Sequence, residues 1–306
     1  MNTAELLASI KRGVAIPANQ NRYTDVDILA MANEETQTKL LPVLMSLRQE
    51  YLVRKDTVAI VAGQFAYPIP YRAVGRTLRD VLFITGNTLA SLPYIQPEDA
   101  QYYSNNAYST GTPTGFYFEG DNVILIPTPN STVGSLVLKY ALRCSALTDI
   151  STAGQITAIN TTGNYVTVAS MPSILTIGAN ADFIQGKSGN TIIAMDQTIT
   201  NISSTNIYFT SLPSTLAIGD WVSLAETSPV VQLPQEMHQV LAQAVECRLL
   251  EGLGDFEGLQ ASSAKLAEKT VAMLSLLTPR IQGEQIKIIQ RNGLLNRGTS
   301  LRRRGF

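Results

Sequence analysis

Apolar side chains recur at three- and four-residue spacing early in the chain, which is the pattern of a helix with one buried face. The stripe runs from Thr24 to about Leu52 and consists of Ile28, Leu29, Ala32, Leu40, Leu44 and Leu47. Thr24 is expected to cap the helix, because Asp27 follows three residues later as in a capping box. Pro42 lacks a backbone donor, so it predicts a kink or a break within the stretch.

Alternating apolar positions follow the helical stripe and are typical of half-buried strands. Residues 57–67 alternate around Gly63-Gln64, and residues 116–126 alternate around Gly120-Asp121. A glycine-containing turn between two such runs is the signal of a hairpin. We therefore predict a hairpin at each of these places.

Further strands are predicted at residues 78–84 and 136–140, where apolar side chains alternate again. Between them, Pro97 is suited to the first turn of a short helix. Because the connections are short, the strands of residues 57–149 are expected to be antiparallel.

The next part of the chain repeats itself. Three short segments recur 41 to 43 residues further on, and the pairs are Ile156–Ile159 with Ile199–Ile202, Tyr165–Val168 with Ile207–Thr210, and Pro172–Gly178 with Pro213–Gly219. Each unit is expected to form strand, turn, strand, loop and strand, so two units can pack as a compact β-sandwich or barrel. Two copies are too few for a solenoid. We interpret residues 150–227 as a small β-domain inserted between elements of the main body.

Helical spacing returns near the C-terminal end. One helix is expected to begin at Pro234 and to end at the glycine-rich turn Gly252–Gly258. A second is expected over about Phe256–Leu277, because Pro279 cannot continue it. Two helices joined by a short turn form an αα-hairpin, on which the helix that begins near Thr24 can pack.

These elements predict an α+β fold. A helical bundle, built from N-terminal and C-terminal helices, carries inserted antiparallel β regions that include a duplicated small β-domain. The predicted segments are a flexible N-terminal segment at 1–23, a helical core at 24–56 and 228–278, an antiparallel β region at 57–149, an inserted β-domain with an internal repeat at 150–227, and an extended C-terminal arm at 279–306.

Charged residues make up 15% of this chain of 306 residues, against roughly 25% in typical soluble domains. The resulting surface, rich in Ser, Thr, Asn and Gln, suits a protein that neighbours cover. Residues 279–306 contain one acid, Glu284, and seven basic residues, which are Arg280, Lys287, Arg291, Arg297, Arg302, Arg303 and Arg304. This segment is +6, and the rest is −7 because the whole chain is −1. A basic tail on an acidic body suits a negatively charged partner.

Candidate catalytic chemistry is sparse. His238, the single histidine, has no ligand-type residues at metal-binding spacing, so neither a metal nor a catalytic role is predicted for it. Gly186-Lys187-Ser188 resembles the end of a phosphate-binding loop, but Ala181 stands where the first glycine is required. The residues from Thr191 have the pattern of a strand, whereas such a loop needs a helix. We expect no enzyme, no cofactor and no metal.

Cys144 and Cys247 are expected to be reduced residues in apolar surroundings. Residues 1–12 contain no apolar stretch long enough for a signal peptide, and no run reaches the roughly 18 apolar residues of a membrane span. We therefore expect no membrane association, and a protein made and kept in a cytoplasm or released from one by lysis.

The basic tail contains more apolar residues than solvated disordered tails usually carry. We interpret it as an arm that orders on a partner, with apolar side chains in grooves and arginines paired with carboxylates or phosphates. Residues 287–291 can add as a strand to a partner sheet, and a merely solvated basic end is the alternative. The candidate binding residues are Lys287, Ile288, Ile289, Arg291, Leu294, Leu295, Arg297, Leu301, Arg302, Arg303, Arg304 and Phe306.

Several segments resemble structural proteins of short-tailed and related phages. They are Asp27–Glu35, Leu41–Tyr51, Tyr67–Gly75, Gly111–Tyr117 and Glu246–Leu259, and together they span most of the chain. The family that they resemble is the head-to-tail adaptors, or connectors, which are ring proteins that dock beneath the portal. The duplicated β unit is larger than the simplest adaptors have, and it could face outward or hold fibres or the next tail component.

The resemblance implies a virion protein of the phage neck or tail, made in the host cytoplasm and used during DNA ejection. It implies a ring of twelve copies around the DNA channel, with the portal protein on one side and a tail or nozzle protein on the other. It also implies that the C-terminal arm reaches into the portal and that contact with the channel DNA is passive.

Other functions stay open at this point. The chain could be another tail or virion structural protein, or a nucleic-acid-binding protein whose basic tail binds phosphates in a salt-sensitive way. A carbohydrate-binding or depolymerising tail protein would expose an aromatic platform, and the inserted region holds one tryptophan, Trp221.

Overall fold

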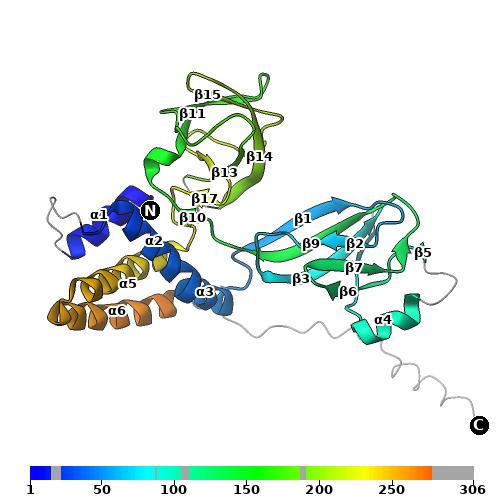
Figure 1. Ribbon diagram of the computed structural model, residues 1–306, viewed down its shortest axis with the longest axis horizontal. Helices are drawn as coiled ribbons and strands as arrows, with labels where there is room; N and C mark the ends of the chain where they lie inside the picture. The colour runs from blue at the N-terminus through cyan, green and yellow to red at the C-terminus, as the bar shows by residue number, and fades with distance from the viewer. Residues whose placement is uncertain (15–21, 87, 105–109, 187–190, 278–306) are drawn as a thin grey trace, which may run out of the picture.

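The computed structural model describes the chain except residues 15–21, 87, 105–109, 187–190 and 278–306. Helices account for 32% and strands for 36%, so the predicted α+β class is confirmed. Figure 1 shows three lobes, which are a group of helices, a barrel and a pair of packed sheets.

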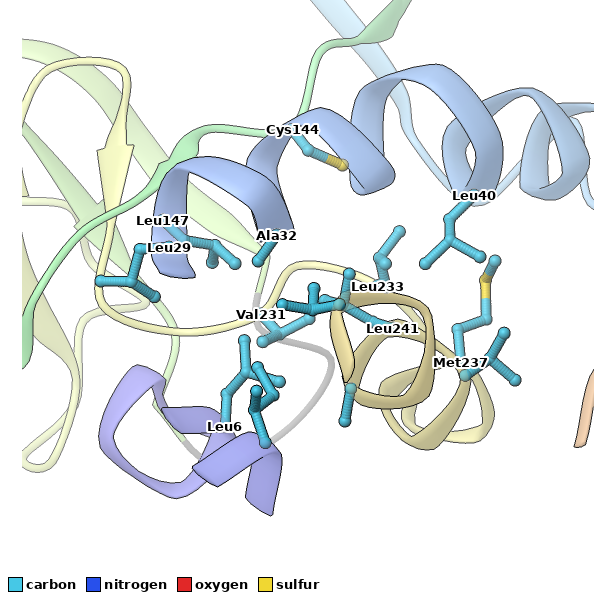
Figure 2. Close-up of a cluster of buried hydrophobic side chains, with 14 of the residues drawn as sticks. Leu6, Leu29, Ala32, Leu40, Cys144, Leu147, Val231, Leu233, Met237 and Leu241 are labelled. Atoms are coloured by element: carbon cyan, nitrogen blue, oxygen red, sulfur yellow. The ribbon is translucent and has the colours of Figure 1, made fainter. Parts of the chain in front are cut away.

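The helical lobe combines elements from both ends of the described chain. Its helices are α1 (Thr3–Gly13), α2 (Asp25–Glu35), α3 (Leu41–Leu47), α5 (Gln235–Leu253) and α6 (Phe256–Leu276). Helix α5 contacts α1, α2 and α6, so it lies at the centre. Figure 2 shows Leu6 of α1, Leu29 of α2 and Leu241 of α5 in one buried cluster, together with Val231 from the segment before α5.

Helix α1 was not predicted, because residues 1–23 were expected to be flexible. Asn2 caps it, since its side chain accepts a hydrogen bond from the Glu5 backbone at 2.8 Å while Glu5 accepts one from the Asn2 backbone at 3.1 Å. Leu6 and Ile10 are fully buried against the rest of the lobe. An 11-residue helix has little stability of its own, so these tertiary contacts stabilise it.

The predicted helix from Thr24 to Leu52 is divided in the structure. The capping box is present, with the Asp27 backbone donating to Thr24 Oγ1 at 3.2 Å and the Thr24 backbone donating to Asp27 Oδ2 at 2.9 Å. A π-helical turn at Thr36–Leu40 separates α2 from α3, and Pro42 lies in the first turn of α3. The predicted irregularity near Pro42 is therefore confirmed, but the helical region ends at Leu47, five residues early.

Two sheets packed face to face form the second lobe. One sheet has the order β1-β9-β3-β4 and the other β2-β7-β6, and their facing side chains share one apolar cluster. The strands are β1 (Val53–Ala59), β2 (Ala66–Pro68), β3 (Ala73–Thr85), β4 (Thr88–Ser91), β6 (Gly115–Glu119), β7 (Asn122–Ile126) and β9 (Ser135–Leu142). Both sheets are antiparallel, and helix α4 (Pro97–Ser104) lies where Pro97 predicted a short helix.

One of the two predicted hairpins in this lobe is wrong. β1 pairs with β9, whereas β2 pairs with β7 in the opposite sheet, so residues 57–67 cross between sheets. The alternation of apolar side chains is the same in a hairpin and in a crossing between two packed sheets, so it could not separate them. The hairpin at Gly120 is confirmed, because β6 pairs directly with β7 and Gly120 has a φ of 56°.

The third lobe is a closed barrel with the strand order β11-β12-β15-β14-β13-β16. Its strands are β11 (Gly154–Asn160), β12 (Tyr165–Val168), β13 (Asn180–Ile184), β14 (Ile192–Ser203), β15 (Asn206–Phe209) and β16 (Trp221–Leu224). Buried apolar side chains such as Phe183 fill its interior. The chain enters and leaves the barrel beside a two-residue parallel pair, β10 (Ala146–Leu147) with β17 (Thr227–Ser228).

The pairing register of the first three barrel strands recurs in the last three. Ile156 lies opposite Val168, as Ile199 lies opposite Phe209, and a register shift follows each pair. Val166 lies opposite Ile207 at the β12–β15 contact. Position 168 therefore corresponds to 209, which moves the sequence match of this segment by one residue, from Ile207–Thr210 to Asn206–Phe209. The alternation of buried positions decides this register, whereas the similarity of the residue types did not.

Candidate assembly surfaces

The residues predicted to bind a partner, from Lys287 to Phe306, lie outside the described residues. The described chain does show where that segment begins. Helix α6 ends at Leu276, and Leu277 is fully buried in the helical core. Arg48, which follows α3, donates from Nη2 to the Leu276 carbonyl at 3.4 Å. The C-terminal segment therefore starts from a fixed point beside α3.

Helix α6 lies against α5 and exposes apolar side chains on its outer face. Phe256 is 78% exposed and Val271 68% exposed, and Leu274 and Leu276 are also exposed. Single exposed apolar residues are common, but Val271 and Leu274 lie three residues apart, so they share one side of the helix and form a small apolar surface there. We name this surface the α6 face.

Hydrogen bonds between polar side chains connect α6 to α5. Gln243 of α5 donates from Nε2 to Ser262 Oγ of α6 at 2.6 Å, and Lys269 of α6 donates to Gln243 Oε1 at 2.6 Å. Burial raises the pKa of Glu246, which accepts a further hydrogen bond from Gln243 at 2.8 Å. Because these contacts are directional, they set the register of α6 and hence which residues form the α6 face.

A buried ion pair attaches the barrel to the two-sheet lobe. Arg72, in the loop between β2 and β3, donates from Nη1 to Asp182 Oδ2 at 2.6 Å and from Nη2 to Asp182 Oδ1 at 3.1 Å. It also contacts Asp196 Oδ1 at 2.7 Å. Arg72 is 4% exposed and Asp182 is fully buried. We name these three residues the Arg72 cluster.

Further hydrogen bonds hold the Arg72 cluster in place. The backbone N–H groups of Asp196 and Glu226 donate to the two carboxylate oxygens of Asp182 at 3.0 and 3.1 Å, and Tyr71 donates to Asp196 at 2.7 Å. Burial alone would lower the pKa of Arg72, but the hydrogen bond and charge of Asp182 raise it above its ordinary value. The guanidinium thus stays charged, and its fork geometry fixes how the barrel sits on the sheets.

The residues examined for catalytic chemistry have structural roles. His238 is buried, with Nε2 3.0 Å from the Leu233 carbonyl, and burial lowers its pKa so that the ring is neutral near pH 7. Burial raises the pKa of the Cys144 thiol to about 12, so it is a poor nucleophile. Cys144 and Cys247 are both free thiols, and Cys247 is half-buried on α5.

The segment that resembles a phosphate-binding loop has another explanation. Gly186 donates its N–H to Asp220 Oδ1 at 2.9 Å, and a Cβ at Gly186 would lie 2.1 Å from the Gly219 carbonyl. Glycine is therefore required by the close approach of two backbone segments. Lys187 and Ser188 lie outside the described residues, and the chain continues as strand β14 from Ile192, as predicted, and not as a helix.

Metal and ligand sites are not evident in the part of the chain that the structure describes. Among those residues no group of three or more His, Cys, Asp or Glu side chains is placed to hold a metal ion. Three cavities have volumes of about 70, 130 and 140 Å³. Small-molecule sites usually enclose roughly 300 Å³ or more. None of the described helices is both long and apolar enough to cross a membrane.

A comparison with known families identifies the family of this chain. The model of the SU10 adaptor protein family matches residues 1–179, which is more than half of the chain. The chain belongs to this family. The match begins before α1 and ends at the residue before β13, within the barrel. No curated protein matches the chain.

An adaptor of this family is a structural component of a phage virion, and it contacts other head and tail components. The surfaces that matter in this adaptor are therefore those that contact other protein chains. The charge of residues 279–306 predicts a C-terminal arm, which lies outside the described residues. The sequence pattern identified neither the α6 face nor the Arg72 cluster, because both depend on contacts between distant segments.

Proposed function

We propose that this adaptor forms a ring, of twelve copies, that docks beneath the portal protein and joins the capsid to a tail or nozzle protein. The observation that carries the proposal is the family match over residues 1–179. In this arrangement DNA passes through the ring during ejection, and its contact with the adaptor is passive. The neck of the virion is the expected location.

The parts of the chain have different roles in this proposal. The helices α1, α2, α3, α5 and α6 form the ring core, and strands β1 to β9 form a β region beside it. Residues 150–227 form a barrel of two similar units, which we propose arose by duplication of one unit. The repeated pairing register supports this origin.

The C-terminal arm, residues 279–306, is proposed to bind the portal. Its net charge of +6 contrasts with the acidic remainder, and its apolar residues can fill grooves on a protein. The described chain ends at Leu277, which is buried in the helical lobe, so the arm follows directly from that lobe. The α6 face is a candidate for contact with a neighbouring copy.

Removal of residues 283–306 tests the arm. The shortened chain should keep its circular dichroism spectrum and its Tm, because the described core ends at Leu277, but it should no longer co-purify with portal-containing heads. Two full-length controls distinguish charge from apolar contact as the cause of binding. In one, Arg302, Arg303 and Arg304 are changed to Gln, and in the other, Leu294, Leu295 and Leu301 are changed to Ser. Attachment of the shortened chain to heads would show that the arm is not the portal-binding element.

The mass of the complex tests the ring. Light scattering of the full chain, alone and mixed with portal protein, should give a species of many copies at least in the presence of the portal. A chain that stays monomeric under both conditions would exclude the ring. If the Arg-to-Gln control alone loses binding and does so in a salt-sensitive way, phosphate contacts dominate and a nucleic-acid role is favoured.

A further inference from the structure

The barrel has two ends that are built alike. β12 and β15 are antiparallel neighbours, so the loops that follow them, residues 169–179 and 210–220, close opposite ends of the barrel. Both loops end in the same turn. The Gly178 N–H donates to the Ile199 carbonyl at 2.8 Å, and the Gly219 N–H donates to the Ile156 carbonyl at 2.9 Å. The φ angles of these glycines are 85° and 95°. We name the two surfaces the Ile177 end and the Ile218 end.

Each end presents exposed isoleucine to solvent. Ile177 is 61% exposed and Ile218 is 59% exposed, and they occupy equivalent positions immediately before the two turn glycines. Ile174 adds a third exposed apolar side chain at the Ile177 end. Exposed apolar side chains at both loop tips are therefore candidates for burial by a partner.

The ends also lack charge. Residues 154–181 and 197–219 contain no Asp, Glu, Lys or Arg, although charged residues make up 15% of the chain. The described charges of residues 150–227 are the buried Asp182 and Asp220, together with Asp196 and Glu226. Asp220 follows the Ile218 loop, and its carboxylate is buried there and accepts from the Ala217 N–H at 2.8 Å. Depletion of charge is the compositional sign of an interface core, because no ionised group has to lose its water when the surfaces meet.

The contact of the barrel with Arg72 lies between its two ends. The two halves of the barrel, β11 to β13 and β14 to β16, are related by an approximate two-fold axis. The axis passes between Val166 and Ile207 on one side of the barrel and between Asp182 and Ser223 on the other. Asp182 contacts Arg72 of the two-sheet lobe, so the barrel is attached along this axis. The two ends therefore point away from each other and across the direction of attachment.

We propose that in the assembled ring the Ile177 end of one copy docks on the Ile218 end of the next copy. This inference rests on the ring of the proposed function. A closed ring of identical subunits needs two different surfaces that fit each other, because each subunit contacts one neighbour with each. The two barrel ends are opposed and carry exposed isoleucine at matching positions, so a second copy can cover each end.

Cysteine cross-linking tests the contact in the full-length chain. In a background with Cys247→Ser, the double variant Ile177→Cys/Ile218→Cys is assembled with portal protein and treated with a short bismaleimide. We expect a ladder of covalent oligomers on a denaturing gel. Each single variant should give no cross-linked dimer, because position 177 of one copy meets position 218 of the next. Both side chains are exposed, so the substitutions should leave the fold unchanged.

Charge substitution gives a second readout. Ile177→Asp alone should raise severalfold the concentration needed for half-maximal assembly, and adding Ile218→Lys in the same chain should reverse much of that loss, since the two charges meet between copies. Val133→Asp is the matched control, because Val133 is 65% exposed in the two-sheet lobe, and it should have little effect.

The outcomes separate this inference from the ring itself. Rings seen by light scattering without the ladder would overturn the barrel contact and leave the ring standing. Cross-linking of either single variant with itself would also overturn it, since that requires like ends to meet. A chain that stays monomeric with portal would overturn both proposals.

Discussion

At the scale of single residues, Gly186 shows how a backbone contact can dictate a side chain. A Cβ there would lie 2.1 Å from the Gly219 carbonyl oxygen, and both segments are held by barrel pairing. The added methyl group would clash with a backbone atom and not with a flexible side chain, so relief of the clash requires a backbone shift.

We predict that Gly186→Ala lowers the free energy of unfolding by about 1–3 kcal/mol, the usual range for overpacking. Gly111→Ala is the matched control, because the nearest atom to its Cβ is a Pro127 side-chain carbon at 3.4 Å. Urea unfolding of the two variants measures the difference. Equal stability of the two would show that the barrel relaxes around the added methyl group.

At the scale of elements, α1 is part of the core. Leu6 and Ile10 are fully buried, and the backbone around α1 is tied to the segment before α5 by Thr3 N–H to the Pro229 carbonyl at 2.8 Å and Val231 N–H to the Met1 carbonyl at 3.1 Å. A helix held at both its apolar face and its N-terminal end contributes to the stability of the whole lobe.

We predict that Leu6→Ala costs about 2–5 kcal/mol, the range for a buried leucine whose site collapses only in part. The matched control is Val26→Ala, at a side chain 71% exposed on α2, which should change stability by less than about 0.5 kcal/mol. Thermal unfolding and hydrogen exchange of α1 amides provide the measurements. Fast exchange throughout α1 in the native protein, with a neutral Leu6→Ala, would support the flexible segment first expected from the sequence.

At the scale of the whole molecule, the Arg72 cluster sets the position of the barrel relative to the sheets. Arg54 of β1 makes a further contact between the two lobes. Its guanidinium donates to the carbonyls of Ile192 and Ile193 at 2.9 and 3.3 Å. The proposed contact between barrels of neighbouring copies needs a fixed orientation, because a barrel free to rotate would lose entropy on assembly.

We predict that Asp182→Ala costs about 3–5 kcal/mol, because it leaves the Arg72 guanidinium buried without its partner. The double variant Arg72→Met/Asp182→Leu should recover much of that loss, since it removes both charges. Asp80→Ala is the control at the half-exposed pair with Lys139, and it should cost at most about 1 kcal/mol. Unfolding free energies and limited proteolysis between the lobes are the readouts. A double variant no more stable than Asp182→Ala would contradict the explanation.

Much of the local structure could be predicted from the chain pattern. The capping box at Thr24, the irregularity near Pro42, the hairpin at Gly120 and the two C-terminal helices are specified by residues within a few positions of one another. Spacing, caps and turn residues act over that range, so they can be recognised without knowing the rest of the fold.

The pairing of distant segments was decided only in three dimensions. Whether β1 pairs with β2 or with β9, whether residues 3–13 are helical, and which residue of β15 matches Val168 all depend on contacts across the chain. The same holds for Arg72 and Asp182, which are 110 residues apart in sequence. Burial and pairing between remote segments leave no periodic signal, so the barrel's attachment and the placement of its two ends emerge only from the folded structure.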